Sequence, residues 1–223
     1  MLASAGYLIS VIFMLRSLQS LRQLYPGKLP WLFIAGGLAT LIIQFNPSWR
    51  DGLIYDRSAL PSGQFWRIWT GHLVHFGWPH FLADAGLFMI MGGLLEARHA
   101  RFSHWALLLM PAFISAIIYY FDPNMGRYGG LSAVNLGLLL YWAAQGWQRQ
   151  WSDWFWPGVL VIYVGEIIFE IIQGGRGGGM IQFDDPSIKV ATNAHVASAA
   201  YALVAWAIAA RHNRITPRST AGN

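Results

Sequence analysis

A serine and a histidine stand at the starts of two different apolar segments of this chain. Ser132 comes directly after Gly130 and Leu131, and His195 begins a later segment. A serine hydroxyl becomes a strong nucleophile when a base within hydrogen-bond distance takes its proton, and histidine is the usual base. The pair therefore predicts acyl-transfer chemistry, provided that the fold brings the two segments together.

The same chemistry needs donors for the negative charge that develops on the substrate oxygen. Backbone amides near Leu131 are candidates, because the first amides of a helix have no partner within it. His80 offers a side-chain donor, and Asp84 lies four residues further on the same helical face. An ionised carboxylate repels an oxyanion, so we expect Asp84 to be neutral, paired or directed elsewhere. His80, Asp84, Gly130 and Leu131 are therefore the candidate oxyanion-binding or substrate-binding residues.

Membrane-spanning helices must position these side chains. Of the 223 residues, 55% are hydrophobic and 11% are charged, whereas soluble domains carry about 25% charged residues. A spanning helix needs about 20 mostly apolar residues. Six segments are long and apolar enough: Leu29 to Phe45, His80 to Glu96, His104 to Phe121, Leu131 to Trp147, Trp154 to Ile172 and Asn193 to Ala210. The sequence predicts an all-α polytopic membrane protein with a six-helix bundle.

The chain divides around this bundle into three parts. Residues 1–28 form an apolar and basic N-terminal segment, in which residues 2–15 are either an interfacial helix or an extra weak span. Residues 29–210 form the six-helix core, and residues 211–223 form a basic tail. Nine of the 15 Lys and Arg residues fall on the side of the two termini. Because basic loops stay inside, both termini are predicted to be cytoplasmic.

This topology places the candidate side chains at one depth. The second, fourth and sixth segments then start on the external side, so His80, Ser132 and His195 lie at similar depth. Small residues at four-residue spacing let helices approach closely. The fourth segment offers Ala133 and Gly137, and the sixth offers Ser198 and Ala202.

Composition excludes several other kinds of site. The chain has no cysteine, which rules out thiolate catalysis and disulfides. Its basic residues are scattered, so we expect no nucleic-acid partner. His72, His75 and His80 suggest a metal set, but Gly77 and Pro79 break the helical register before His80. We therefore expect no metal and no cofactor, with His72 and His75 as hydrogen-bonding loop residues.

Several short motifs, taken in order, resemble the rhomboid intramembrane serine proteases. The resemblance runs from Trp66 to Leu203 and rests on Trp66-Arg67, His75 five residues before His80, Gly92-Gly93 with Glu96 and Arg98, Gly130-Leu131-Ser132, and His195 with small residues three and seven positions later. It implies a six-helix core and a Ser-His dyad, with Ser132 as nucleophile, His195 as base, and His80 and Asp84 at the oxyanion site. It also implies membrane-anchored protein substrates, cut near the external face of the bacterial inner membrane.

The chain departs from the family pattern at four positions. Ala133 replaces a glycine, Asp84 an asparagine, Leu136 an aromatic residue or histidine, and Ser198 a glycine. These changes bear on catalytic efficiency more than on the fold. The compact length, the run Thr70-Gly71-His72 and Glu170 are most similar to the rhombosortase branch, which trims proteins that carry a C-terminal glycine-rich sorting tail.

Two other functions stay open on the sequence alone. A rhomboid-like protein that binds membrane clients without cutting them would explain Asp84 and Ala133. A transporter would use Glu166 and Glu170, which lie four residues apart on one helical face inside an apolar segment. The glycine-rich run 174–179 is expected to be a flexible external loop that gates substrate entry.

Overall fold

The computed structural model describes residues 29–149, 154–172 and 191–215. The N-terminal segment 1–28, the glycine-rich run 174–179 and most of the predicted basic tail lie outside the described residues, as do the side chains of Glu166 and Glu170.

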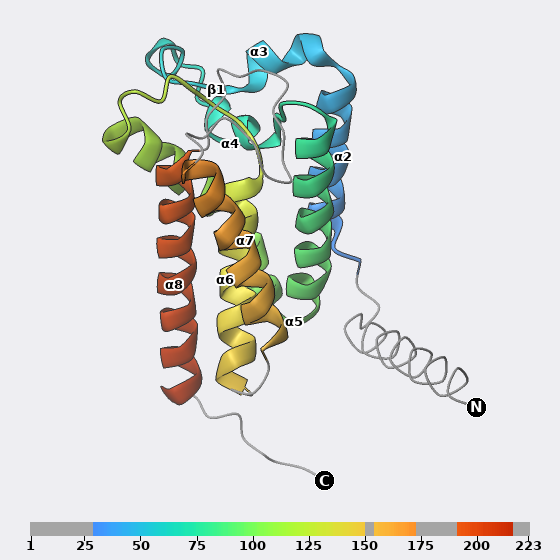
Figure 1. Cartoon of the computed structure of the whole chain (residues 1–223), viewed down its shortest axis with the longest axis vertical. Coiled ribbons are helices and arrows are strands. Elements are labelled where there is room, and N and C mark those ends of the chain that lie inside the picture. Colours follow the sequence, from blue (N-terminus) through green and yellow to red (C-terminus); the bar gives the residue numbers. More distant parts are fainter. Residues whose placement is uncertain (1–28, 150–153, 173–190, 216–223) are drawn as a thin grey trace, which may run out of the picture.

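Helices occupy all six predicted apolar segments. They are α2 (Trp31–Phe45), α5 (Trp78–Phe121), α6 (Ser132–Arg149), α7 (Phe155–Ile172) and α8 (Thr192–Ile215). One long helix, α5, contains both the second and the third segment, and its 44 residues are interrupted at His99, where φ is −138° and ψ is 39°. Figure 1 shows the chain running down one side of the bundle before this break and returning upward after it. The break is therefore the turn between two antiparallel halves of α5.

Two of these helices, α5 and α8, are long and apolar enough to cross a membrane. A third candidate arises if α2 and the short helices after it are one span, bent by 102°. By length and composition the described residues thus supply two or three spans, whereas six were predicted. The chain is a mostly helical integral membrane protein.

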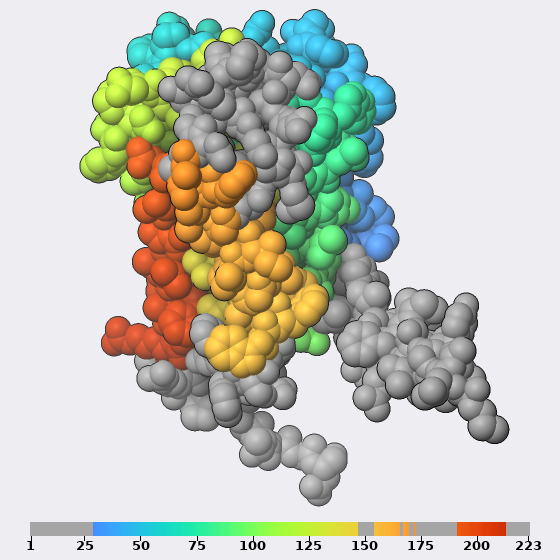
Figure 2. Space-filling model, viewed as in Figure 1, coloured from blue at the N-terminus to red at the C-terminus, as the bar shows by residue number. Residues whose placement is uncertain are grey.

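The outer surfaces of the helices are those of a protein in lipid. Large apolar side chains point outward along the bundle, including Ile90, Val161 and Ile208, each more than half exposed. An apolar surface of this extent is unfavourable in water and favourable against lipid chains. Figure 2 shows α7, in gold and orange, on the outside of the bundle next to α8.

The inner surfaces pack through small residues, as expected for α6 and α8. A Cβ atom placed on Gly137 of α6 would lie 3.2 Å from the backbone oxygen of Ser198 in α8. Ser198 and Ala202 are fully buried. Gly92 in α5 is tighter still, because a Cβ there would lie 2.2 Å from Cγ of Phe33 in α2. Glycine at these two positions lets neighbouring helices approach closely.

Short elements cap one end of the bundle between α2 and α5. They are η1 (Pro47–Trp49), α3 (Arg50–Leu53), β1 (Tyr55–Asp56), η2 (Leu60–Ser62), α4 (Arg67–Thr70) and η3 (Gly71–Leu73). Strand β1 pairs antiparallel with β2 (Arg127–Tyr128), with Tyr55 opposite Tyr128. This two-residue ladder is a small departure from the all-α prediction. We call residues 47–73 together with β2 the cap.

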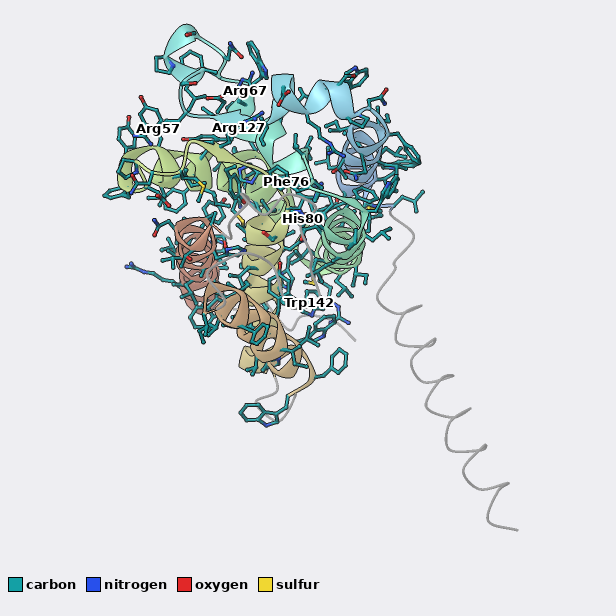
Figure 3. All side chains as sticks on the ribbon, turned by 45° about the horizontal axis from the view of Figure 1, so that its top comes forward. Arg57, Arg67, Phe76, His80, Arg127 and Trp142 are labelled. Atoms are coloured by element: carbon teal, nitrogen blue, oxygen red, sulfur yellow. The ribbon has the colours of Figure 1, made fainter. Side chains whose placement is uncertain are left out.

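Polar contacts of Trp66 and Arg67 hold the cap together. The buried Arg67 Nη1 donates to the carbonyl oxygens of Asp51 and Ile54, at 2.8 and 2.7 Å. The indole of Trp66 donates to the Gly52 carbonyl at 3.1 Å. Arg127, from β2, forms an ion pair with Asp51. Figure 3 shows Arg67 and Arg127 at the same end of the molecule.

Candidate active site

Three helices begin at the capped end of the bundle and bring the candidate residues there. Figure 1 shows that α5, α6 and α8 all start at this end. His80 is the third residue of α5, Ser132 is the first of α6 and His195 is the fourth of α8. The side chains that the sequence predicted to share one depth therefore begin their helices at the same end of the molecule.

His195 is held in one orientation by its own helix. Its Nδ1 lies 3.0 Å from the carbonyl oxygen of Ala191, which can only accept, so the proton is on Nδ1. The other nitrogen, Nε2, is buried and makes no hydrogen bond to any described residue. An imidazole with a fixed Nδ1–H and an available Nε2 lone pair is the form that a general base needs.

Ser132 is positioned by the turn that precedes α6. Gly130 has φ of 113°, a value that residues with a side chain rarely adopt. The Ser132 carbonyl accepts a 2.8 Å hydrogen bond from the Tyr163 hydroxyl of α7, which fixes the start of the helix. Because His195 Nε2 makes no hydrogen bond among the described residues, the Ser132 hydroxyl is not bonded to it in this state. Catalytic hydrogen bonds often form only when substrate is bound.

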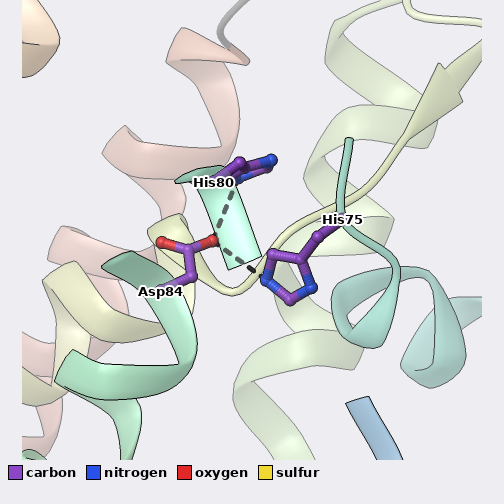
Figure 4. A group of neighbouring side chains, drawn as sticks. All are labelled: His75, His80 and Asp84. Carbon is purple, nitrogen blue, oxygen red and sulfur yellow. Dashed lines mark ion pairs between the residues drawn. The ribbon is translucent and has the colours of Figure 1, made fainter. Parts of the chain in front are cut away.

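Asp84 is paired with two histidines, one of the three arrangements expected for it. Its Oδ2 lies 3.2 Å from Nε2 of His75 and 3.1 Å from Nε2 of His80 (Figure 4). All three side chains are buried. The Asp84 backbone carbonyl accepts a 2.9 Å bond from Asn135 Nδ2, which ties α5 to α6 at this level. Sequence reasoning did not single out Asn135, whose buried amide inside an apolar segment was the available signal.

His75 enters the site because the chain reverses direction before α5. Gly77, with φ of 99°, allows this reversal, and the rings of His75 and His80 end 4.9 Å apart. The helical register therefore breaks before His80, as predicted, and the two histidines still meet across this break. Burial lowers the pKa of His75, and the neighbouring carboxylate of Asp84 opposes this.

His72 lies apart from this group and serves as a hydrogen-bonding residue, as expected. Its Nε2 is 3.1 Å from the Pro111 carbonyl and 3.3 Å from the Ser115 hydroxyl, both in α5. Burial lowers the pKa of His72 to about 4, so the ring is neutral at physiological pH. His72 thus links the cap to the second half of α5.

The backbone beside Ser132 is close to the histidines. The Leu131 amide donates to Nε2 of His75 over 3.4 Å, so this candidate oxyanion donor is engaged in this state. A Cβ atom on Gly130 would lie 2.9 Å from His80 Nε2 and 3.3 Å from Asp84 Oδ2. The four candidate oxyanion residues, His80, Asp84, Gly130 and Leu131, are thus gathered around one small volume.

A family model described as the Rhomboid domain matches residues 62–212, which is more than half of the chain and includes every candidate residue. No curated protein matches the chain.

Proposed function

The chain belongs to the rhomboid family, and we propose that it is an intramembrane serine endopeptidase, with Ser132 as nucleophile and His195 as base. The observation that carries the proposal is the buried Nε2 of His195, which has no hydrogen-bond partner among the described residues and lies at the end of the bundle where α6 begins with Ser132. A buried histidine nitrogen without a partner is unfavourable unless a substrate or a second catalytic group uses it.

The proposed reaction follows from the protonation of His195. Nε2 takes the proton of the Ser132 hydroxyl as Oγ attacks the carbonyl carbon of the peptide bond, and the carbonyl oxygen becomes an oxyanion. His195 then gives this proton to the leaving amine, and an acyl-enzyme remains. Water then attacks the acyl-enzyme, with His195 again acting as base, and the acid product leaves Ser132. The Ala191 carbonyl, 3.0 Å from Nδ1, supports the positive charge that the imidazole carries in between.

In the proposed oxyanion site, the negative charge of Asp84 opposes the negative charge that develops on the substrate. A carboxylate at about 5 Å from an oxyanion opposes it by about 3 kcal/mol at an effective dielectric constant of about 20. Asp84 brings such a charge directly to His80, the side-chain donor of the site. This contact favours the second candidate function, a rhomboid-like protein that binds membrane clients without cutting them. The side chains of Glu166 and Glu170, on which the transporter alternative rests, lie outside the described residues.

In the proposed membrane arrangement, the chain crosses six times and both termini are cytoplasmic. The two halves of α5 then count as two crossings, and the cap lies on the external face, where the substrate is cut. The apolar outer surface of the bundle and the shared end of α5, α6 and α8 support this arrangement.

For the substrate, we extend the proposal to membrane-anchored proteins with a C-terminal sorting tail, as in the rhombosortase branch. The supporting residues, Thr70, Gly71 and His72, all have structural roles. Thr70 donates to the Leu53 carbonyl at 2.6 Å, and a Cβ on Gly71 would lie 2.6 Å from the Tyr55 amide nitrogen. The three residues that resemble the rhombosortase branch therefore shape the cap, which a substrate would contact first in the proposed arrangement.

The test is cleavage of a tailed substrate by the full-length protein in vesicles, together with labelling by a fluorophosphonate. Ser132→Ala and His195→Ala are each expected to abolish cleavage, because nucleophile and base act as a unit. Labelling is expected to be lost in Ser132→Ala. The matched control is Ser58→Ala in the cap, where the hydroxyl bonds only locally to Asp56. Cleavage by Ser132→Ala at the wild-type rate would refute the dyad, and an unlabelled but client-binding wild type would favour the non-proteolytic function.

A further inference from the structure

His75, His80 and Asp84 present three metal-ligating atoms to one buried volume (Figure 4). The two Nε2 atoms lie 3.2 and 3.1 Å from Asp84 Oδ2, and all three ligand atoms lie within 4.8 Å of one another. Nitrogen and oxygen ligands about 2.1 Å from a tetrahedral Zn²⁺ lie about 3.4 Å from each other. The spacing of the three atoms therefore fits one ion of this size with small side-chain adjustments.

The carboxylate oxygen at the centre of this group lacks a hydrogen bond. Asp84 Oδ2 is buried and has no hydrogen bond of good geometry from any described residue, although two ring nitrogens are close to it. A buried carboxylate oxygen in this condition carries a large desolvation cost. A cation between the oxygen and the two nitrogens would remove that cost.

The hydrogen bonds of His75 direct a lone pair toward the same volume. The Thr40 hydroxyl donates to the Leu73 carbonyl at 2.6 Å, so at 3.0 Å it must accept from His75 Nδ1–H. Nε2 is then unprotonated, and its lone pair accepts a long bond of 3.4 Å from the Leu131 amide, which a metal ion would replace. Metal-ligating histidines are arranged in this way, with the second nitrogen donating to a neighbouring group that fixes the tautomer.

His80 must change its tautomer to become a ligand. The Phe76 amide donates to its Nδ1 over 3.3 Å, which places the proton on Nε2. Figure 3 shows Phe76 and His80 next to each other below the cap. To bind a metal through Nε2, the ring transfers this proton to Nδ1 and gives up the long bond from Phe76. Coordination by a neutral imidazole compensates for a hydrogen bond of that length.

We infer that His75, His80 and Asp84 bind one divalent transition-metal ion, with Zn²⁺ favoured by two imidazoles and one carboxylate. The turn at Gly130 borders this site, because a Cβ atom there would approach both His80 and Asp84. Binding changes the formal charge of the group from −1 to +1, so the field at the start of α6 is reversed. The inference does not depend on the proposed protease activity.

The experiment uses the full-length protein in detergent after treatment with a chelator. Zn²⁺ binding is measured by titration calorimetry and by metal analysis after gel filtration, and Co²⁺ is the spectroscopic probe. We expect one ion per chain and a Co²⁺ absorption band typical of a four-coordinate site. Asp84→Asn, which keeps the side-chain volume, and His75→Gln are each expected to weaken binding by at least about 100-fold, and Thr40→Ala by about 10-fold to 100-fold.

Two control variants show whether Zn²⁺ binds at the proposed site and whether binding depends on the proposed nucleophile. His104→Gln removes a half-exposed histidine that lies 2.8 Å from Glu96, and it is expected to leave Zn²⁺ binding unchanged. Ser132→Ala is also expected to bind like the wild type, so that a failure of the dyad is distinguishable from a failure of the metal site. The inference would be overturned if no stoichiometric Zn²⁺ is bound, or if binding survives Asp84→Asn in a folded protein. The remaining interpretation would be a proton shared between Asp84 and its two histidines.

Discussion

Substitution of Gly130 by alanine tests how tightly the turn before Ser132 is coupled to His80. With φ of 113°, Gly130 has a conformation that costs a residue with a side chain about 1–3 kcal/mol. The added Cβ would also lie 2.9 Å from both Nε2 and Cε1 of His80. That ring is buried between Asp84 and Phe76 and cannot move away freely, so overpacking adds about 1–3 kcal/mol.

We therefore expect Gly130→Ala to lower the free energy of unfolding by about 2–6 kcal/mol. We also expect it to reduce cleavage by at least about tenfold, since a displacement of His80 worth about 1.4 kcal/mol in the transition state suffices for that. The reason is that relief of the contact moves either His80, the proposed oxyanion donor, or the backbone that carries Ser132, the proposed nucleophile.

The control is Gly126→Ala, four residues earlier in the same loop, where an added Cβ meets no atom within 4 Å. Unfolding is followed by a detergent-denaturant titration, and cleavage by initial rates on one tailed substrate in vesicles. If Gly130→Ala behaves like Gly126→Ala in both assays, the turn does not constrain His80 and the reasoning fails.

Three further predictions concern helix contact, charge and pH. Gly137→Val is expected to inactivate the protein by separating α6 from α8. Gly146→Val is the control in the same helix and should retain activity, because an added Cβ there meets no atom within 4 Å. Comparison of the two cleavage rates checks this. Asp84→Asn, assayed with chelator present, should retain or increase cleavage at neutral pH, because the amide can donate to His75 without opposing the oxyanion. Loss of activity in this variant would mean that the carboxylate itself is required. His72 should contribute a fall of about 3 kcal/mol in the free energy of unfolding between pH 6.5 and about 4, because its buried neutral ring gains a proton on unfolding over that range. Denaturant titrations at several pH values should show a fall that is smaller by this amount in His72→Gln.

The helices could be predicted from the sequence because long apolar segments leave few alternatives in a bilayer. Every predicted segment is helical, and even Pro111 inside α5 does not interrupt the helix. The interruption falls instead at His99, which carries no helix-breaking side chain. Across the interruption, Glu96 accepts hydrogen bonds from Ser103 and His104. The two-residue strands of the cap are too short to produce a sequence pattern.

The candidate site was predictable in its residue types but not in its contacts. The positions of His80, Ser132 and His195 at the starts of their helices follow from the bounds of the long apolar segments. The pairing of Asp84 with His75 does not, because it depends on the backbone conformation at Gly77. Spacing arguments assume a continuous helix, and they fail where a glycine with positive φ reverses the chain.

The cap described above also bears on the order in which the protein folds. Asp51 and Arg127, whose ion pair helps to close it, are 76 positions apart in the chain. The ladder between β1 and β2 joins residues that are 71 and 73 positions apart. Helices in a membrane form individually and associate afterwards, and contacts between distant segments are the slowest to form. The turn that presents Ser132 begins two residues after the end of β2, so it acquires its shape only with the last long-range contacts. On the proposed function, a newly inserted chain would therefore form its helices before its active site, and cleavage would begin only after assembly.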